Sequence, residues 1–137
     1  MYKIGVVGYS AKKFDQKEAE KILNTAFAII EKINGNDDYM VVSGLTNIGI
    51  PAIAYRLANS RGWKTSGIAC KKAEEYDCFP VDEKRIIGEE WGDESKSFIN
   101  EIDCIIRVGG GEQSKKEVKM AKERDIAIYE YELPEKK

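Results

Sequence analysis

Histidine is absent from this 137-residue chain, and its absence narrows the possible chemistry more than any other feature of the composition. Without an imidazole the chain has no histidine general base, no histidine to activate a serine or cysteine nucleophile, and no histidine ligand for a metal. Hydrolysis by a serine–histidine–aspartate triad and most zinc chemistry are therefore excluded.

Cysteine and long apolar runs are also scarce. The three cysteines, Cys70, Cys78 and Cys104, are odd in number and show no Cys-x-x-Cys spacing, which predicts reduced thiols. No segment approaches the roughly 18 uninterrupted apolar residues of a membrane helix, and residues 1–8 lack the basic and apolar parts of a signal peptide. We therefore expect a cytoplasmic protein that does not bind membranes.

Neither sign of charge dominates the chain. Its 22 basic and 24 acidic side chains give a net charge of −2 and are interspersed along the sequence. Nucleic acid is therefore not expected as a partner. The length fits one domain, residues 1–137, built around one hydrophobic core.

Apolar segments of strand length alternate with helical patterns. Asp15 followed by Glu18 is typical of a capping box, and the apolar residues after it recur at helical spacing up to Asn34. We predict strands at 3–7, 39–42, 64–70, 85–87, 104–108 and 126–131, helices at 16–34, about 51–61, about 95–102 (capped by Asp93 or Ser95) and 114–124, and a frayed tail at 133–137. This alternation predicts an α/β fold, a single Rossmann-like, doubly wound and mostly parallel sheet flanked by helices.

Three consecutive glycines, Gly109, Gly110 and Gly111, follow the β-branched run at 104–108 and precede a polar helix start. Glycine N–H groups and the positive end of a helix favour a bound phosphate. The stretch is not a Walker loop, since no Gly-Lys-Ser/Thr follows. It is not a full dinucleotide fingerprint either, since Ser114 stands at the third glycine position. A purely structural turn is the alternative.

Two further glycine-bearing loops follow the first and second predicted strands, at 8–14 and 43–49. In a parallel sheet such loops open on the carboxyl edge, where ligands bind. Tyr9, Ser10 and Lys12 are placed where a base or phosphate could rest. The predicted ligand-binding residues are Gly8, Tyr9, Ser10, Ser43, Gly44, Thr46, Gly49, Gly109, Gly110, Gly111, Gln113, Ser114 and Glu117.

Five acidic residues leave two interpretations open. Asp82, Asp93, Glu94, Glu112 and Glu117 either form a carboxylate cluster for a hard cation or, as we favour, are solvated surface acids, because their spacing is not diagnostic. We predict no metal and no cofactor.

Trp91 and Arg107 also allow two interpretations each. We favour Trp91 closing the core over Trp91 stacking on a base. Arg107 either lines the mouth of the ligand site or forms a salt bridge at a sheet end.

The segment from Gly109 to Glu117 resembles the Pro-Gly-Gly-x-Gly-Thr-x-x-Glu motif of the lysine-decarboxylase-like, Lonely Guy group in the SLOG superfamily of Rossmann-like nucleotide binders. Residues 43–54 resemble the first glycine motif of that group, residues 63–68 resemble the strand that follows it, and Asp103 falls where the group has an aspartate. The likeness extends over roughly residues 3–131.

The resemblance implies a phosphoribohydrolase in which an arginine and the final glutamate of the motif cleave an N-glycosidic bond. Glu117 matches that glutamate, which makes it the candidate catalytic residue, and Ser114 matches the phosphate-binding threonine. Glu94 stands near the position of the arginine, so that positive charge is missing. Gly109 replaces the proline, and Gln113 replaces the inner glycine. Members commonly pair through helices, so a homodimer or larger homo-oligomer is expected.

Three functions follow from these observations. The leading hypothesis is a protein that binds a nucleotide or nucleotide-derived ligand as a carrier, sensor or sponge. The alternative is an enzyme, an N-glycosidase acting on nucleoside monophosphates. The third is an interaction module whose glycine loops are structural.

Overall fold

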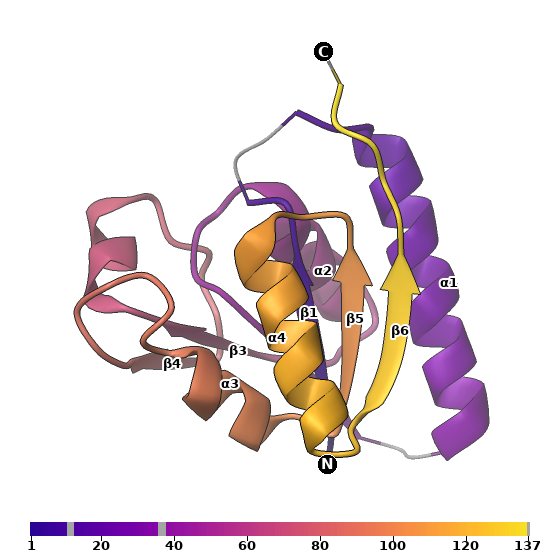
Figure 1. Ribbon diagram of the computed structural model, residues 1–137. Helices are drawn as coiled ribbons and strands as arrows, with labels where there is room; N and C mark the ends of the chain where they lie inside the picture. Colours follow the sequence, from indigo (N-terminus) through magenta and orange to yellow (C-terminus); the bar gives the residue numbers. More distant parts are fainter. Residues whose placement is uncertain (11–12, 36–37, 137) are drawn as a thin grey trace.

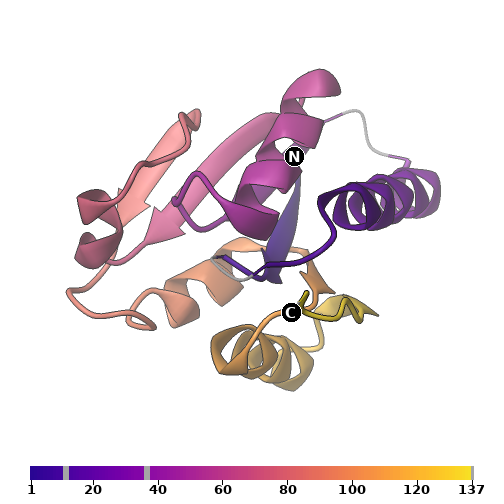
Figure 2. The ribbon, with the colours of Figure 1, turned by 90° about the horizontal axis from the view of Figure 1, so that it is seen from above.

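The computed structural model describes residues 1–10, 13–35 and 38–136. These residues fold into one six-stranded sheet with helices on both faces (Figures 1 and 2). Lys12, expected in the first loop, lies outside the described residues. The elements in chain order are β1 (Tyr2–Gly8), α1 (Gln16–Asn34), β2 (Tyr39–Ser43), α2 (Gly49–Ser60), β3 (Lys64–Ala69), the 3₁₀ helix η1 (Lys71–Glu75), β4 (Glu83–Ile86), α3 (Ser95–Glu101), β5 (Cys104–Val108), α4 (Glu112–Glu123) and β6 (Ala127–Tyr131).

The strand order is β4-β3-β2-β1-β5-β6, and every neighbouring pair is parallel. The predicted α/β, doubly wound sheet is therefore confirmed. From β1 the chain builds outward through β2, β3 and β4, and then crosses to the other side of β1 for β5 and β6. The order thus reverses between β1 and β5, and in folds of this kind a crevice opens at the carboxyl ends of the strands where the order reverses.

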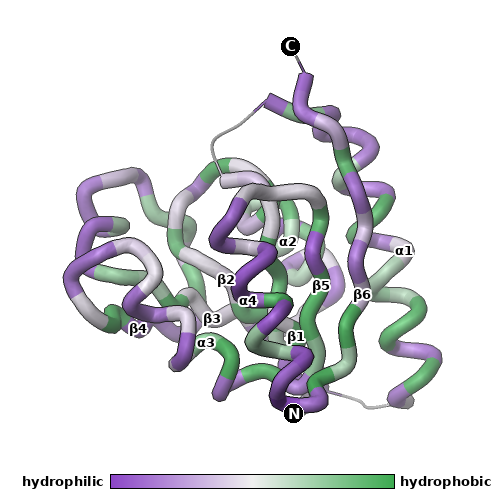
Figure 3. Tube along the Cα trace, viewed as in Figure 1, coloured by the Kyte–Doolittle hydropathy of each residue, from purple (hydrophilic) through white to green (hydrophobic). Residues whose placement is uncertain are grey.

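Helices α1 and α2 cover one face of the sheet, and α3 and α4 cover the other (Figure 2). Phe27 of α1 and Tyr55 of α2 are fully buried against one face, and Phe98 of α3 and Val118 of α4 are buried against the other. Both faces are covered, so the central strands are hydrophobic on both sides, and β5 is buried along its whole length. Helix α4 is largely hydrophilic in Figure 3. No helix in residues 1–10, 13–35 and 38–136 is long and apolar enough to span a membrane.

The first helix begins and ends as its sequence predicts. The Asp15 carboxylate accepts a hydrogen bond of 3.0 Å from the N–H of Glu18, which confirms the N-terminal cap. At the other end Gly35 adopts a φ of 60° and donates its N–H to the carbonyl of Glu31. These two caps fix α1 between the loop after β1 and the start of β2.

Two helix starts differ from the sequence prediction. The N-cap of α3 is Glu94, with no capping side chain, because the Asp93 carboxylate instead accepts the N–H groups of Glu89 and Glu90 at 3.0 and 2.9 Å. Helix α4 begins at Glu112 rather than at 114, directly after the three glycines. Gln113 therefore lies in the first turn of α4 and not in a loop.

The prediction of a frayed tail is wrong for residues 133–136. Leu133 is 5% exposed, and its carbonyl accepts a hydrogen bond of 2.8 Å from the Tyr9 hydroxyl. The N–H of Lys136 donates to the carbonyl of Lys13 at 2.8 Å. Because these partners belong to the loop after β1, no local pattern in the tail could have indicated them. The C-terminus lies at the carboxyl edge of the sheet (Figure 1).

Arg107 forms a salt bridge at the sheet end. Its side chain is buried and pairs with Glu130 at 2.8 Å and with Glu132, and it donates to the carbonyl of Gly109 at 2.9 Å. Of the two interpretations left open by the sequence, the ion pair therefore holds, and the arginine ties β5 to β6 and to the start of the tail.

Candidate functional site

A cavity of about 410 Å³ opens at the carboxyl edge of the sheet, beside the switch point between β1 and β5. Its walls come from the ends of β1, β2 and β3, from the loops after them, and from α3 and the first turns of α4. The predicted site residues that line it are Gly8, Tyr9, Ser10, Ser43, Gly44, Thr46, Gly111, Gln113, Ser114 and Glu117. Gly49, Gly109 and Gly110 lie nearby in sequence but do not line it. The three predicted loops thus converge on one cavity.

The loop after β2 is held rigidly against the sheet. The Ser43 hydroxyl donates to the carbonyl of Val6 at 2.6 Å. The hydroxyl of Tyr55, on α2, lies 2.7 Å from the carbonyl oxygen of Gly44 and 3.0 Å from that of Ser66. These contacts fix the backbone of Gly44 on the cavity wall before any ligand binds.

The loop after β1 is anchored by Tyr9. Its ring stacks on Phe14, with 5.6 Å between ring centroids, and its carbonyl accepts a hydrogen bond of 2.7 Å from the N–H of Ile50. This close passage explains Gly49, which has a φ of 70° and where a Cβ would lie 2.3 Å from the Tyr9 carbonyl oxygen. Gly49 is therefore required because the loop after β1 packs directly against the start of α2.

The first two glycines of the triplet also serve internal packing. Gly109 and Gly110 have φ values of 59° and 100°. A Cβ on Gly109 would lie 2.4 Å from the Tyr9 ring, and one on Gly110 would lie 2.2 Å from the Ser114 hydroxyl oxygen. The sequence favours a bound ligand as the reason for all three glycines. In the structure, the positive φ values of the turn and the close approach of Tyr9 and Ser114 already require two of them.

Gly44 and Gly111 are different, because no contact among the described residues requires a glycine at either position. Neither has a φ in the left-handed region, and apart from the adjacent residues in the chain no described atom lies within 4 Å of a Cβ built on either residue. Both line the cavity. Their backbones are therefore open to close approach from the cavity side.

The N-terminus of α4 faces the same space without a side-chain cap. Gly111 is its N-cap, and in the described chain no side chain accepts a hydrogen bond from the first turn. The Ser114 hydroxyl instead donates to the carbonyl of Gly111 at 2.9 Å. The first N–H groups of a helix have no partner within the helix, so this end of the twelve-residue α4 offers donors and a positive dipole end to an anion.

Two carboxylates line the cavity close to the first turns of α4. Glu94 and Glu117 are only 6% and 7% exposed and both line the cavity, so the prediction of solvated acids is wrong for this pair. The Ser95 hydroxyl donates to Glu117 at 3.1 Å. Burial raises the pKa of Glu117 to about 7, with the Ser95 hydrogen bond opposing the rise and the nearby Glu94 charge adding to it. Glu117 can therefore hold or release a proton near neutral pH.

Trp91 lies at the mouth of the cavity and not in the core. It is 48% exposed, lines the cavity and contacts Tyr76, with 6.1 Å between ring centroids. Gly92 has a φ of 99°, so the chain turns immediately after the indole and leaves it on the surface. The sequence prediction of a core tryptophan is therefore wrong, and about half of the side chain is accessible at the edge of the cavity.

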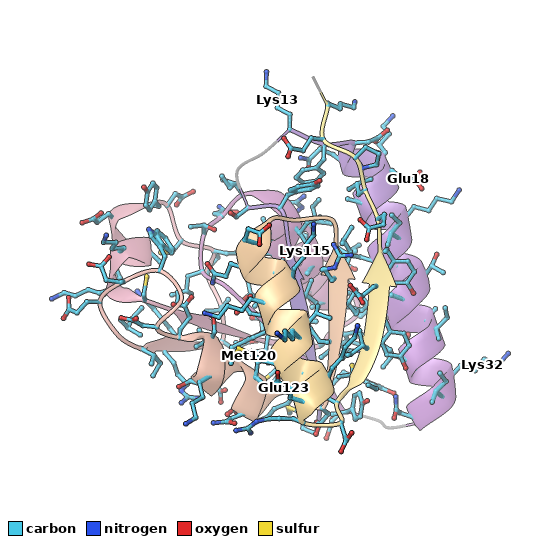
Figure 4. All side chains as sticks on the ribbon, in the orientation of Figure 1. Lys13, Glu18, Lys32, Lys115, Met120 and Glu123 are labelled. Atoms are coloured by element: carbon cyan, nitrogen blue, oxygen red, sulfur yellow. The ribbon has the colours of Figure 1, made fainter. Side chains whose placement is uncertain are left out.

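A second, shallower groove adjoins the cavity and carries positive charge. It shares Trp91 with the cavity and adds Lys115, Lys116 and Lys119, which all project from α4. Figure 4 shows Lys115 on the first turns of this helix. Sequence reasoning did not single out these lysines, although their spacing on one helix could have indicated them. Among residues 1–10, 13–35 and 38–136 no group of three or more acids and cysteines could hold a metal ion.

No family model and no curated protein matches this chain. Solved structures do match this chain. The chain aligns with TM1055, a structural genomics target, at 21% identity over 93% of this chain and 72% of that one, with a TM-score of 0.73. It aligns with the molybdenum cofactor binding protein of the phototrophic bacterium Rippkaea orientalis at 20% identity over 96% and 76%, with a TM-score of 0.75.

A third match is the molybdenum cofactor carrier protein of Chlamydomonas reinhardtii, at 18% identity over 94% of this chain and 75% of that one, with a TM-score of 0.71. At these identities the likeness establishes a shared Rossmann-like fold. The resemblance read from the sequence is thus supported at the level of the fold and not as membership of a family.

Proposed function

We propose that this chain binds a small, phosphate-bearing ligand of the nucleotide type in the carboxyl-edge cavity, and holds or carries it without converting it. The observation that carries the proposal is the pair Gly44 and Gly111. Both glycines lie on the cavity, and neither is required by backbone conformation or internal packing. A ligand that approaches the backbone at these points is a sufficient reason for both.

The anionic end of the ligand belongs at the N-terminus of α4. The uncapped N–H groups there are the donors of the cavity that suit a phosphate, and the lysines of the adjoining groove add positive charge on the same side. The carboxylates of Glu94 and Glu117 lie close to the first turns of α4 and would repel an anion in direct contact with them. The anion is therefore expected at the backbone N–H groups and not at these two side chains.

A carrier function has support from the fold neighbours. Two of them are described as carrying or binding the molybdenum cofactor, so this fold is used for holding a small ligand in at least these proteins. A carrier needs a built cavity and no catalytic groups. The cavity also lacks the cation that the Lonely Guy motif pairs with its glutamate, because no lysine or arginine of the described chain lines it.

One observation favours N-glycosidase activity as a second candidate. Glu117 is buried on the cavity wall and its pKa is raised to about 7, which suits a group that transfers a proton at neutral pH. In such a reaction the bond between C1′ and the base nitrogen breaks, water supplies the new oxygen at C1′, and the proton goes to the leaving base.

The test is thermal unfolding with nucleoside mono- and diphosphates, NAD, ADP-ribose, cyclic nucleotides and the molybdenum cofactor, followed by chromatography of each mixture. A ligand at a hundred times its dissociation constant should stabilise the fold by about 2.7 kcal/mol. Recovery of intact ligand supports the carrier, and release of free base supports the glycosidase. If no phosphate-bearing compound raises the melting temperature, the proposal fails.

Gly111→Val and Gly110→Val are a matched pair for this assay. Gly111 has ordinary backbone angles and open space beside it, so its valine variant should fold normally and lose at least tenfold in ligand affinity. The Gly110→Val variant should instead lose about 2 kcal/mol or more of stability, because of its φ of 100° and the Ser114 hydroxyl. Normal ligand binding by Gly111→Val would contradict the placement of the site.

A further inference from the structure

Glu94 is a buried carboxylate with half of its hydrogen-bonding capacity unused. One oxygen, Oε1, accepts from the Gln113 side-chain amide at 3.1 Å and from the N–H of Gly92 at 3.3 Å. The other, Oε2, is buried and has no hydrogen-bond partner in the described part of the chain. An unpaired buried acceptor is costly and rare in native proteins. We therefore expect Oε2 to accept a hydrogen bond from a bound ligand.

The orientation of this carboxylate is set by its neighbours. Gln113 comes from the first turn of α4, and Gly92 comes from the turn that Asp93 stabilises through the N–H groups of Glu89 and Glu90. The other wall carboxylate, Glu117, is held by Ser95 from the first turn of α3. Two helices and a turn therefore position a pair of acceptors on one side of the cavity.

The walls around the pair are apolar and partly aromatic. Phe98, Ile68 and Val7 are buried and line the same cavity, and the half-exposed Trp91 also borders it. Such walls suit a flat ring and do not suit a strongly hydrated ammonium group, which would lose its water without compensation. The donor that reaches the carboxylates should therefore be part of a heterocycle.

We propose that Glu94 and Glu117 recognise the donor edge of a flat heterocycle, an amino group beside a ring N–H, as found in guanine and in pterins. Two neighbouring N–H groups match the free Oε2 of Glu94 and the carboxylate of Glu117, and form charge-assisted hydrogen bonds with them. Adenine presents an amino group beside a ring acceptor, which would face a carboxylate oxygen. This inference rests on the proposed function and names the chemistry that the two carboxylates of the cavity recognise.

Two matched ligand pairs test the edge directly. GMP and IMP differ by the 2-amino group alone, and pterin and lumazine differ by the amino group against an oxygen. Isothermal titration should give a dissociation constant about 10- to 100-fold lower for GMP than for IMP, or for pterin than for lumazine. The first result assigns the edge to a nucleotide and the second to a free pteridine.

Glu94→Gln should remove the preference for the member of each pair that carries the amino group. The amide keeps the shape of the side chain but places a donor where the acceptor was, so the ratio between the members of a pair should fall to about threefold or less. Glu89→Gln is the control, because it removes the same charge from an exposed residue nearby whose side chain does not line the cavity. It should leave the ratio unchanged, and melting temperatures should show that both variants fold.

The outcomes separate the two proposals. If the wild-type protein binds both members of each pair with equal affinity, or if Glu94→Gln keeps the preference, the inference about the edge is overturned while ligand binding stands. If none of the phosphate-bearing compounds nor either pteridine binds, the proposed function is overturned and the inference with it. The ratio of the two dissociation constants of the wild-type protein tests the inference even if the Glu94→Gln variant does not fold.

Discussion

Replacing Glu117 with glutamine should change how the stability of the protein depends on pH. Burial raises the pKa of Glu117 from an ordinary value of 4.5 to about 7. Between these values the folded chain keeps a proton that the unfolded chain has released, so stability falls as the pH rises through this window. The stabilising contribution is complete below about pH 4.5 and is lost by about pH 7.

The size of the effect follows from the shift. About two and a half pH units at roughly 1.4 kcal/mol each make about 3.5 kcal/mol in full, of which about 3 kcal/mol is lost between pH 4.5 and pH 7 because the titration is gradual at both ends. Because the chain has no histidine, no other side chain with an ordinary pKa titrates in the upper part of this window. Asp15 and Glu101 have lowered pKa values, so their contributions are constant there.

Urea unfolding at 25 °C, at pH values from 5 to 8, measures this loss. The free energy of unfolding of the wild-type protein should fall by about 3 kcal/mol at most, and that of Glu117→Gln should stay nearly flat. Glu123→Gln, at the exposed far end of α4 (Figure 4), is the matched control and should keep the wild-type slope. A flat wild-type profile, or an equal slope in Glu117→Gln, would refute the argument.

Two further predictions concern the rim of the site and the tail. Trp91→Ala should leave the free energy of unfolding within about 1 kcal/mol of wild type, since the indole is half exposed. It should weaken ligand binding about 3- to 10-fold, because stacking on the indole is lost. An unchanged dissociation constant would argue against a role for the indole. Arg107→Met should cost about 2 kcal/mol and speed proteolytic cleavage after residue 131, whereas the exposed Arg124→Met should do neither.

Much of the fold could be predicted because its signals are local. The cap at Asp15, the glycine after α1 and the alternation of apolar runs with helical patterns depend on residues close in sequence. The convergence of three loops on one cavity then follows from parallel strands, whose carboxyl ends share an edge. This is why the candidate site could be located without knowing a single tertiary contact.

The chemistry of the site could not be predicted in the same way. Glu94 and Glu117 are 23 residues apart, and only the packing of α3 against α4 buries them together. The reasons for the glycines are equally nonlocal, because Gly109 contacts Tyr9 from the other end of the chain. Trp91 could not be placed on the surface, since tryptophans of cores and of rims look alike in a sequence.

The hydrogen bond between Tyr9 and Leu133 joins residues that are 124 positions apart in the chain. Likewise, β1 occupies the middle of the sheet only once β5, about a hundred residues later, has paired with it. Contacts of such long sequence separation form late, because the loop that they close carries a large entropic cost. During synthesis the loop after β1 would therefore gain this anchor only after residue 133 has emerged, so the cavity wall at Tyr9 would be completed late in folding.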